Sequence, residues 1–394
     1  MSELDRDRVA VPDGRTRAVL SSRPAVRSVA VYCVPAAATL TWLIAVVAAD
    51  EFGRVADHWE STITMIFGSF LAGSSPEGGG AVAFPIFTKV LEAPAAVART
   101  FSLSIQAVGM TVASIVILLT GRTIEWRAFV VALPLGVAGF FVGLFALGDR
   151  SELFWGFRVS PAYAKVTFTI TLAAMAYLMF VILRSQDKGA DRCPIWNARV
   201  SVGLAGAAFV GGAITSLTGT GVNVMLFLFI VLMAGLHPRV GVPTSILTMA
   251  SLSIVGFVAL SLIHGQFDLG FNAMGEVISV SDRVADPPLQ AGRVDLLGFW
   301  LAAVPVVVWG APLGTWVVHI LHERRLIMFV GVLAFVEVLT TVIFLDDLRS
   351  NRALLAYFVG GLILALVGVR VLRRYRRSIL GFPTDRHGAP DAGG

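Results

Sequence analysis

Charged side chains are scarce in this sequence, and their scarcity excludes an ordinary soluble protein. Only 14% of the 394 residues are Asp, Glu, Lys or Arg, whereas 56% are hydrophobic. Soluble domains carry roughly 25% charged residues, and the mean hydropathy of this chain is +0.79. The composition therefore predicts an integral membrane protein with little mass outside the bilayer.

Cysteine and the common catalytic motifs are also nearly absent. The two cysteines are Cys33, inside the first long apolar run, and Cys193, in a polar stretch, so no disulfide framework is expected. The sequence has no HExxH, nucleotide-binding loop or GxSxG, which argues against hydrolysis and ATP-driven pumping. His319 and His322 of HILHER are too few for a zinc site. We expect no metal, cofactor or nucleic-acid partner.

Most of the chain consists of long apolar runs. Each run is long enough to cross about 30 Å of hydrocarbon as a helix. They predict eight full spans, near 29–49, 100–120, 128–148, 163–183, 242–263, 297–318, 326–345 and 353–372. Two further stretches, 61–92 and 200–236, are apolar but interrupted by glycine and polar residues. The expected fold class is an all-α polytopic membrane protein.

The placement of arginine predicts the orientation in the membrane. Residues 1–28 are Arg-rich and lack an apolar core followed by a cleavage site, so we expect a cytoplasmic tail and no cleaved signal peptide. A second arginine cluster follows the last span, and the positive-inside rule puts both termini in the cytoplasm. The loop 265–295 is acidic and should face outward. The expected location is the cytoplasmic membrane of the cell.

An internal repeat organises the chain. GRTIEWRAF at 121–129 resembles GRVDLLGFW at 292–300, and SSPEGGGAVAFPIF at 74–87 aligns with TSLTGTGVNVMLFLF at 215–229. Further matches keep the same order along the two halves: Ala132, Pro134, Gly139 and Gly143 recur as Ala303, Pro305, Gly310 and Gly314, and Pro94 and Thr100 as Pro238 and Thr244. Ordered matches across three segments predict a duplication.

The duplication divides the chain into seven parts. Each repeat should hold one broken element and three transmembrane helices, with one extra helix at each end of the pair. The expected parts are the tail 1–28, an extra helix 29–49, repeat 1 at 61–184, a cytoplasmic linker 185–199, repeat 2 at 200–345, an extra helix 353–372 and a basic tail 373–394.

The broken elements predict a cavity inside the membrane. Arms of about 11–14 residues give roughly 16–21 Å of helix, which reaches only part of the way across the bilayer. Irregular backbone at that depth is tolerated where protein or a water-filled cavity satisfies its polar groups. Each element is either a re-entrant hairpin or a span unwound at its centre. Hairpins are favoured because they make the two repeats inverted, a common transporter plan.

The glycines of the two breaks point to an anion. The second arms begin just after them, so the N–H groups of residues 79–81 and 220–222 should face the break, and helix N-termini bind anions. Glycine also admits a ligand to the backbone, although tight helix packing is the alternative role. If the two tips meet at mid-membrane, the candidate substrate-binding residues are Ser74, Ser75, Gly78, Gly79, Gly80, Thr218, Gly219, Thr220, Gly221 and Asn223.

The duplicated pattern resembles a known family. Both glycine-rich breaks are followed within about twenty residues by a short Thr-containing stretch, Ala98-Arg-Thr100 and Val242-Pro-Thr244-Ser245. This arrangement resembles the sulfite exporter TauE/SafE family over roughly residues 60 to 345. The resemblance implies export of small sulfur-containing anions and adds Thr100, Thr244 and Ser245 to the candidate binding residues. The chain departs from the family at Glu77, where the family usually has an apolar residue.

Two carboxylates lie deep in apolar sequence and are candidates for proton coupling. Glu77 is in the first break and Glu337 is in AFVEVLTT, and ionised groups near the bilayer centre usually face the bundle interior. A structural hydrogen bond is the alternative for both. Lys89 and Arg99 are candidates to pair with Glu77 or to attract anions by their positive charge. The alternative is that their side chains extend to the membrane interface.

These observations favour a secondary transporter over an enzyme. The expected function is movement of a small anion, sulfite or an organosulfonate, by alternating access with possible proton coupling. The alternatives are transport of another small solute, charged or uncharged, and a membrane-embedded enzyme or sensor that uses the same pocket. An enzyme would place nucleophile, acid and base together, and here the carboxylates are scattered.

Overall fold

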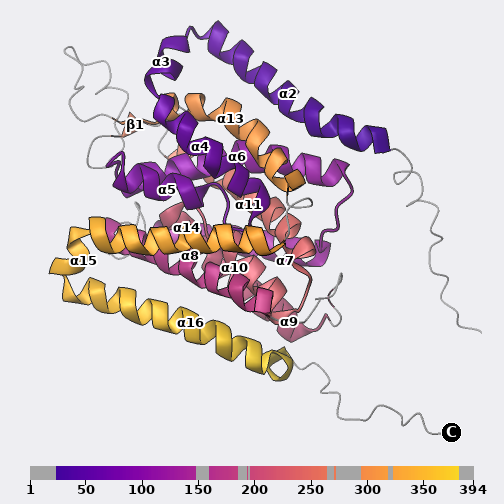
Figure 1. Cartoon of the computed structure of the whole chain (residues 1–394), viewed down its shortest axis with the longest axis vertical. Coiled ribbons are helices and arrows are strands. Elements are labelled where there is room, and N and C mark those ends of the chain that lie inside the picture. Colours follow the sequence, from indigo (N-terminus) through magenta and orange to yellow (C-terminus); the bar gives the residue numbers. More distant parts are fainter. Residues whose placement is uncertain are drawn as a thin grey trace, which may run out of the picture.

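A computed structural model describes residues 24–147, 159–184, 193, 196–263, 270–271, 294–317 and 323–380, and these residues are almost entirely helical (Figure 1). In chain order the elements are α2 (Pro24–Ala48), α3 (Phe52–Asp57), α4 (Trp59–Ser74), α5 (Gly80–Lys89), α6 (Ala95–Leu119), α7 (Trp126–Ala146), α8 (Pro161–Arg184), α9 (Ala198–Thr218), α10 (Val222–Leu228), the π-helix η2 (Phe229–Met233), α11 (Pro238–Ile263), β1 (Gly270–Phe271), β2 (Val294–Asp295), α13 (Leu296–Val317), α14 (Glu323–Phe344), α15 (Asp346–Ser350) and α16 (Arg352–Leu380). The only strands among the described residues are the short antiparallel pair β1 and β2.

The prediction of an all-α membrane protein is confirmed by the helices of the described residues. Within the described residues, eight helices are long and apolar enough to cross a membrane: α2, α6, α7, α8, α9, α11, α13 and α16. The run 326–345 lies in α14, whose described apolar part is Ala334–Phe344. The predicted short first arm is wrong for α9, which is 21 residues long.

The first broken element folds back on itself. The ring of Phe299, at the start of α13, is 4.5 Å from the ring of His58, which precedes α4. The same ring is 5.2 Å from the ring of Phe87, near the end of α5. The end of α5 therefore returns to the level at which α4 begins. We call residues 59–89 hairpin 1, and residues 75–79 its tip.

The second broken element also folds back. A Cβ on Gly211 of α9 would lie 2.7 Å from the Cα of Val222, where α10 begins. A Cβ on Gly203, two turns earlier in α9, would lie 2.7 Å from the ring of Phe229. The segment formed by α10 and η2 therefore runs antiparallel to α9. We call residues 198–233 hairpin 2, and residues 219–221 its tip.

Each hairpin packs against a helix of the other half of the chain. Hairpin 1 lies with α4 along α13, and hairpin 2 lies with α9 along α7, while α6 packs on α11 and α8 on α14. Glycines bring the backbones together, because a Cβ on Gly310 would overlap Ser69 and a Cβ on Gly139 would overlap the backbone of Phe209. Gly139 and Gly310 are paired by the sequence repeat, and they make equivalent contacts.

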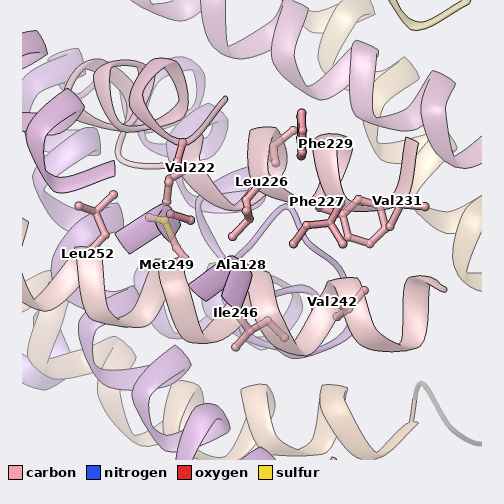
Figure 2. Close-up of a cluster of buried hydrophobic side chains, with 14 of the residues drawn as sticks. Ala128, Val222, Leu226, Phe227, Phe229, Val231, Val242, Ile246, Met249 and Leu252 are labelled. Carbon is pink, nitrogen blue, oxygen red and sulfur yellow. The ribbon is translucent and has the colours of Figure 1, made fainter. Parts of the chain in front are cut away.

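An apolar core surrounds hairpin 2 (Figure 2). Leu226 and Phe227 of α10 are fully buried, as are Ile246 and Met249 of the neighbouring α11. Their packing fixes the second arm of the hairpin against a long helix, and so it holds the tip in place.

The two terminal helices lie at opposite edges of the bundle (Figure 1). Helix α2 is anchored on α13, where the indole N–H of Trp42 donates to the Leu301 carbonyl at 3.0 Å. Helix α16 is anchored on α8, where the hydroxyls of Tyr357 and Thr167 are 2.9 Å apart. Neither helix contributes a residue to the hairpin tips described below.

A salt bridge links the segment before α4 to β2, at the end of the bundle where hairpin 1 begins. Arg54 donates to both carboxylate oxygens of Asp295, with Nε at 2.6 Å and Nη2 at 2.5 Å, and His58 Nε2 is 3.6 Å away. Burial opposes ionisation of the Asp295 carboxyl, but the bonds from Arg54 and from the Gly298 N–H outweigh it and lower the pKa of that carboxyl. The contact therefore stabilises the folded protein at neutral pH, and it is lost as acid protonates Asp295.

Candidate functional site

The two hairpin tips are in direct contact, as expected from the sequence. The hydroxyl of Thr220 in hairpin 2 donates to the backbone carbonyl of Glu77 in hairpin 1 at 3.0 Å. Both residues are buried, with exposed fractions of 4% for Thr220 and 1% for Glu77. The interruptions of two helical hairpins, distant in sequence, thus form one buried polar centre.

Glycine is required at one position of each tip by its backbone conformation. Gly78 has φ +75° and Gly219 has φ +78°, which is the left-handed region that other residues adopt only at a cost. Gly219 ends α9 with its N–H bonded to the Thr215 carbonyl at 2.8 Å, as left-handed C-caps do. The sequence repeat aligns these two glycines, and they share a conformation.

The glycines Gly79 and Gly80 lie where a side chain would fill the space between neighbours. A Cβ on Gly80 would lie 3.2 Å from the Cβ of Thr220 and 3.3 Å from the side-chain nitrogen of Gln106. A Cβ on Gly79 would lie 3.3 Å from the terminal methyl of Met65. Gly80 therefore lets hairpin 1 approach Thr220 and Gln106 more closely than a residue with a side chain would.

The backbone donors expected to face the break are partly occupied within the protein. The N–H of Gly221 donates to Asn223 Oδ1 at 3.1 Å, and the N–H of Val222 donates to the hydroxyl of Thr215 at 2.9 Å. The N–H of Ala81 points to the Gly78 carbonyl at 3.3 Å. The expectation that these three groups are available to a ligand is therefore wrong, because side chains and turn carbonyls of the hairpins already accept from them.

Gln106 of α6 joins the two tips, and it was not among the residues predicted from the sequence. Its side-chain N–H group donates to the Gly219 carbonyl and to the Ser102 carbonyl, both at 2.9 Å. Its oxygen lies 2.7 Å from the position of a Cβ on Gly78. One sequence pattern could have indicated this residue. Arg99, Ser102 and Gln106 are polar residues spaced three and four apart, so they lie on one side of an otherwise apolar helix.

Arg99 places a positive charge beside the tip of hairpin 2. It is 3% exposed, so the alternative that it snorkels to the interface is wrong. Its Nη1 donates to the Ser216 carbonyl, in the last turn of α9, at 3.3 Å, and its Nη2 to the Thr100 hydroxyl at 3.4 Å. A cation at a helix C-terminus is favourable, and this one is also close to the polar centre.

The remaining candidate residues divide into two groups. Ser75 and Thr218 lie in the hairpin ends, where Thr218 donates to the Thr220 carbonyl at 2.6 Å and Ser75 accepts from the Glu77 N–H at 3.3 Å. Thr244 instead accepts from the backbone N–H of Glu125 at 3.1 Å, in the connection between α6 and α7. Ser245, beside it, donates to the Val242 carbonyl at 2.9 Å. No described contact joins Thr244 or Ser245 to the tips.

Several buried polar atoms of this centre have no hydrogen-bond partner among the described residues. They are the hydroxyls of Ser74 and Ser102, both carboxylate oxygens of Glu77, the side-chain oxygen of Gln106 and the side-chain nitrogen of Asn223. Buried polar groups are almost always hydrogen-bonded in folded proteins, because an unmet one costs about 1–3 kcal/mol. The unpartnered groups of this centre therefore favour a polar ligand or water as their hydrogen-bond partner.

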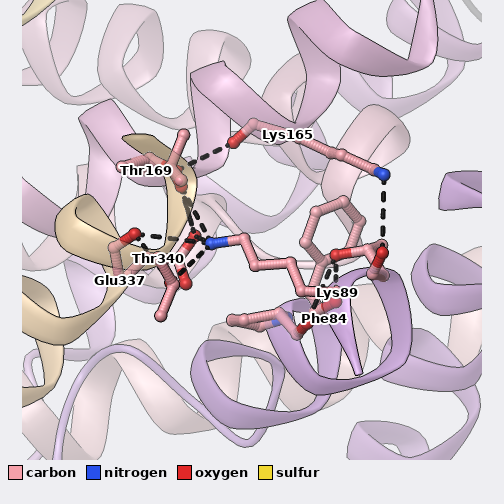
Figure 3. A network of polar contacts seen from close by, with 9 residues as sticks. Phe84, Lys89, Lys165, Thr169, Glu337 and Thr340 are labelled. Atoms are coloured by element: carbon pink, nitrogen blue, oxygen red, sulfur yellow. Dashed lines mark hydrogen bonds and ion pairs between the residues drawn. The ribbon is translucent and has the colours of Figure 1, made fainter. Parts of the chain in front are cut away.

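Glu337 lies in a different network, which ties hairpin 1 to α8 and α14 (Figure 3). Lys89, at the end of α5, is 2.7 Å from Glu337 Oε1 and donates to the hydroxyls of Thr340 and Thr341 at 3.0 and 2.8 Å. The Thr169 hydroxyl also donates to Glu337 Oε1, at 3.0 Å. Glu337 is thus paired with a cation, whereas no partner is described for the carboxylate of Glu77.

No group of His, Cys, Asp and Glu that could hold a metal ion occurs among the described residues. His319 and His322 lie outside the described part of the chain, as do most of the loop 265–295 and much of the tails and of the linker 185–199.

One comparison with known proteins gives a match. The family model described as "Sulfite exporter TauE/SafE" matches residues 61–341, a range that contains both hairpin tips, Gln106 and Glu337. A search of the curated proteins and a search of the solved structures gave no match.

Proposed function

Because the chain belongs to the sulfite exporter TauE/SafE family, we propose that it is a secondary transporter whose substrate binds where the two hairpin tips meet. The substrate class is sulfite or an organosulfonate. The membership makes it a multi-pass membrane transporter of sulfite-type anions. The observation that carries the binding site is the contact between Thr220 and Glu77, with unpartnered polar atoms gathered around it.

The two halves support a mechanism of alternating access. We propose that residues 61–184 and 200–345 are inverted repeats, with both termini in the cytoplasm of the cell. Hairpin 1 then enters from the outer side and hairpin 2 from the cytoplasmic side. Equivalent contacts at Gly139 and Gly310 support this symmetry. Movement of one hairpin against its partner helix would open the centre to one side at a time.

The proposal is tested with the purified protein. A ligand that binds only the folded state stabilises it by about 2.7 kcal/mol at a hundredfold excess over its Kd. We expect sulfite or a small sulfonate to raise the unfolding temperature in detergent, and labelled anion to cross the membrane of liposomes that contain the protein. Stabilisation and flux by an uncharged solute alone would favour the alternative transporter, and neither effect with any anion would refute the proposal.

Glu77 should make binding depend on pH. Two unit charges about 5–6 Å apart repel by about 3 kcal/mol at an effective dielectric constant near 20, which is roughly a hundredfold in affinity. An anion in the site therefore binds more tightly when Glu77 is protonated, and transport is coupled to protons by linkage. We expect Glu77→Gln to bind the anion at all pH values and to lose this dependence.

The measurement is anion affinity between about pH 5 and 8, with a probe such as methanesulfonate whose own charge stays constant. Glu92→Gln is the matched control, because Glu92 is an exposed carboxylate outside the helices and should leave the profile unchanged. A well-expressed Glu77→Gln protein with the wild-type profile would remove Glu77 from the mechanism.

A further inference from the structure

Two side-chain amides at the hairpin tips point to the kind of anion that the site prefers. We infer that Gln106 and Asn223 select an oxyanion that carries one O–H group, such as hydrogensulfite, over a sulfonate that has none. This inference rests on the proposed function. To the proposed function it adds the protonation state of the preferred substrate and two residues that determine specificity.

The orientation of the Gln106 amide is fixed by its surroundings. Its nitrogen donates to two carbonyl oxygens, those of Ser102 and Gly219, at 2.9 Å each. Carbonyl oxygens can only accept, so the nitrogen must face them and the amide oxygen must point away. That oxygen is buried and has no partner among the described residues.

The orientation of the Asn223 amide is fixed in the opposite sense. Its oxygen accepts from the backbone N–H of Gly221 at 3.1 Å. A backbone N–H can only donate, so the oxygen must face it and the amide nitrogen must point away. That nitrogen is likewise buried, with no partner among the described residues.

The two remaining atoms converge on Gly78. The position of a Cβ on this glycine is 2.7 Å from the Gln106 oxygen and 3.1 Å from the Asn223 nitrogen. One acceptor and one donor therefore flank the same point, next to the tip of hairpin 1. Both side chains are at most 1% exposed, so bulk water does not satisfy them.

An oxyanion with one O–H matches this pair. Its hydroxyl donates to the Gln106 oxygen, and one of its charged oxygens accepts from the Asn223 nitrogen. A sulfonate of the same charge offers acceptors only, so it leaves the Gln106 oxygen unpaired against another oxygen. Sites built around a hydrogen bond to a ligand reject analogues that lack the group, because the buried partner then stays unsatisfied.

The test compares two monoanions of similar size on the wild-type protein in detergent. At mildly acidic pH, hydrogensulfite should bind at least about tenfold more tightly than methanesulfonate, as one buried hydrogen bond implies. Equal affinities would overturn the inference and leave the proposed function standing, with the two amides holding a structural water only. Failure of both anions to bind would refute the proposed function and the inference with it.

Variants of the two amides give an independent readout. Gln106→Met removes the acceptor, so the ratio of the two affinities should fall to near one, whereas a merely structural role would weaken both anions equally. Asn223→Asp keeps the oxygen that accepts from Gly221 but replaces the donor by a charged oxygen, and both anions should bind at least about tenfold more weakly. Asn197→Asp is the matched control, since Asn197 caps the far end of α9 through Val200 and aspartate caps equally well.

Discussion

Replacing Gly80 with valine is expected to abolish transport in a protein that still folds and inserts into the membrane. The Cβ alone would come to 3.2 Å from Thr220 and 3.3 Å from Gln106, closer than most side-chain contacts. The two methyl groups of valine extend further, into the junction between the tips. Gly80 begins α5 and its φ is not in the left-handed region, so the backbone accepts a side chain without strain.

A graded series separates blocked binding from lost stability. Gly80→Ala should reduce flux into liposomes, Gly80→Val should abolish it, and the unfolding temperature of both should stay near that of the wild type. Gly206→Val is the matched control, because Gly206 lies exposed on hairpin 2 with no atom within 4 Å of its Cβ position. Normal flux in the Gly80→Val protein would show that the glycine serves packing alone.

The sequence was sufficient for the fold class because hydropathy and repetition are properties of the chain itself. Long apolar runs and matched glycines gave the helices, and the family model covers the region that the resemblance indicated. The error over the length of α9 has a physical cause. A break at Gly219 marks where α9 ends, but the length of the arm before it depends on packing along α7, which no local pattern records.

The site was harder to predict, because hydrogen bonds between distant residues decide which groups are available. Gly221 and Val222 stand at a helix start and look like anion donors, yet Asn223 and Thr215 already accept from them. Gln106 follows the first break by more than two dozen residues and reaches both tips only through the way α6 packs. The polar and glycine-rich character of the tips was predictable from the sequence, but the helix that joins them was not.

The second large effect is expected at the ion pair of Lys89 and Glu337. Lys89 is 10% exposed and Glu337 is 5% exposed, and Nζ lies 2.7 Å from Oε1. Removal of one partner of a buried pair typically costs about 3–5 kcal/mol, because the other charge stays buried without compensation. Lys89→Met should therefore lower the free energy of unfolding by that amount, measured by thermal or denaturant unfolding in detergent.

The cost should fall in acid, because protonation makes Glu337 neutral and removes its need for a cation. Lys165→Met is the matched control. Among the described residues the ammonium of Lys165 hydrogen-bonds to the Thr88 carbonyl at 3.5 Å and is attracted to Asp347 without a direct ion pair, so its loss should have a much smaller effect. Equal destabilisation by both variants would mean that the methylene stems, rather than the charges, hold hairpin 1 in place.

The double variant Lys89→Met/Glu337→Gln tests whether this pair belongs to the transport mechanism or only to the scaffold. With no charge left to bury, its stability should return to within about 1 kcal/mol of the wild type, since the pair and a neutral replacement are often equivalent. The two single effects should therefore couple by several kcal/mol. If the double variant also transports with the wild-type dependence on pH, the proton is carried elsewhere, and Glu77 is the buried carboxylate that has no partner among the described residues. If the double variant folds but its flux no longer depends on pH, Glu337 carries the proton, and Lys89 is the cation whose ion pair breaks when Glu337 is protonated.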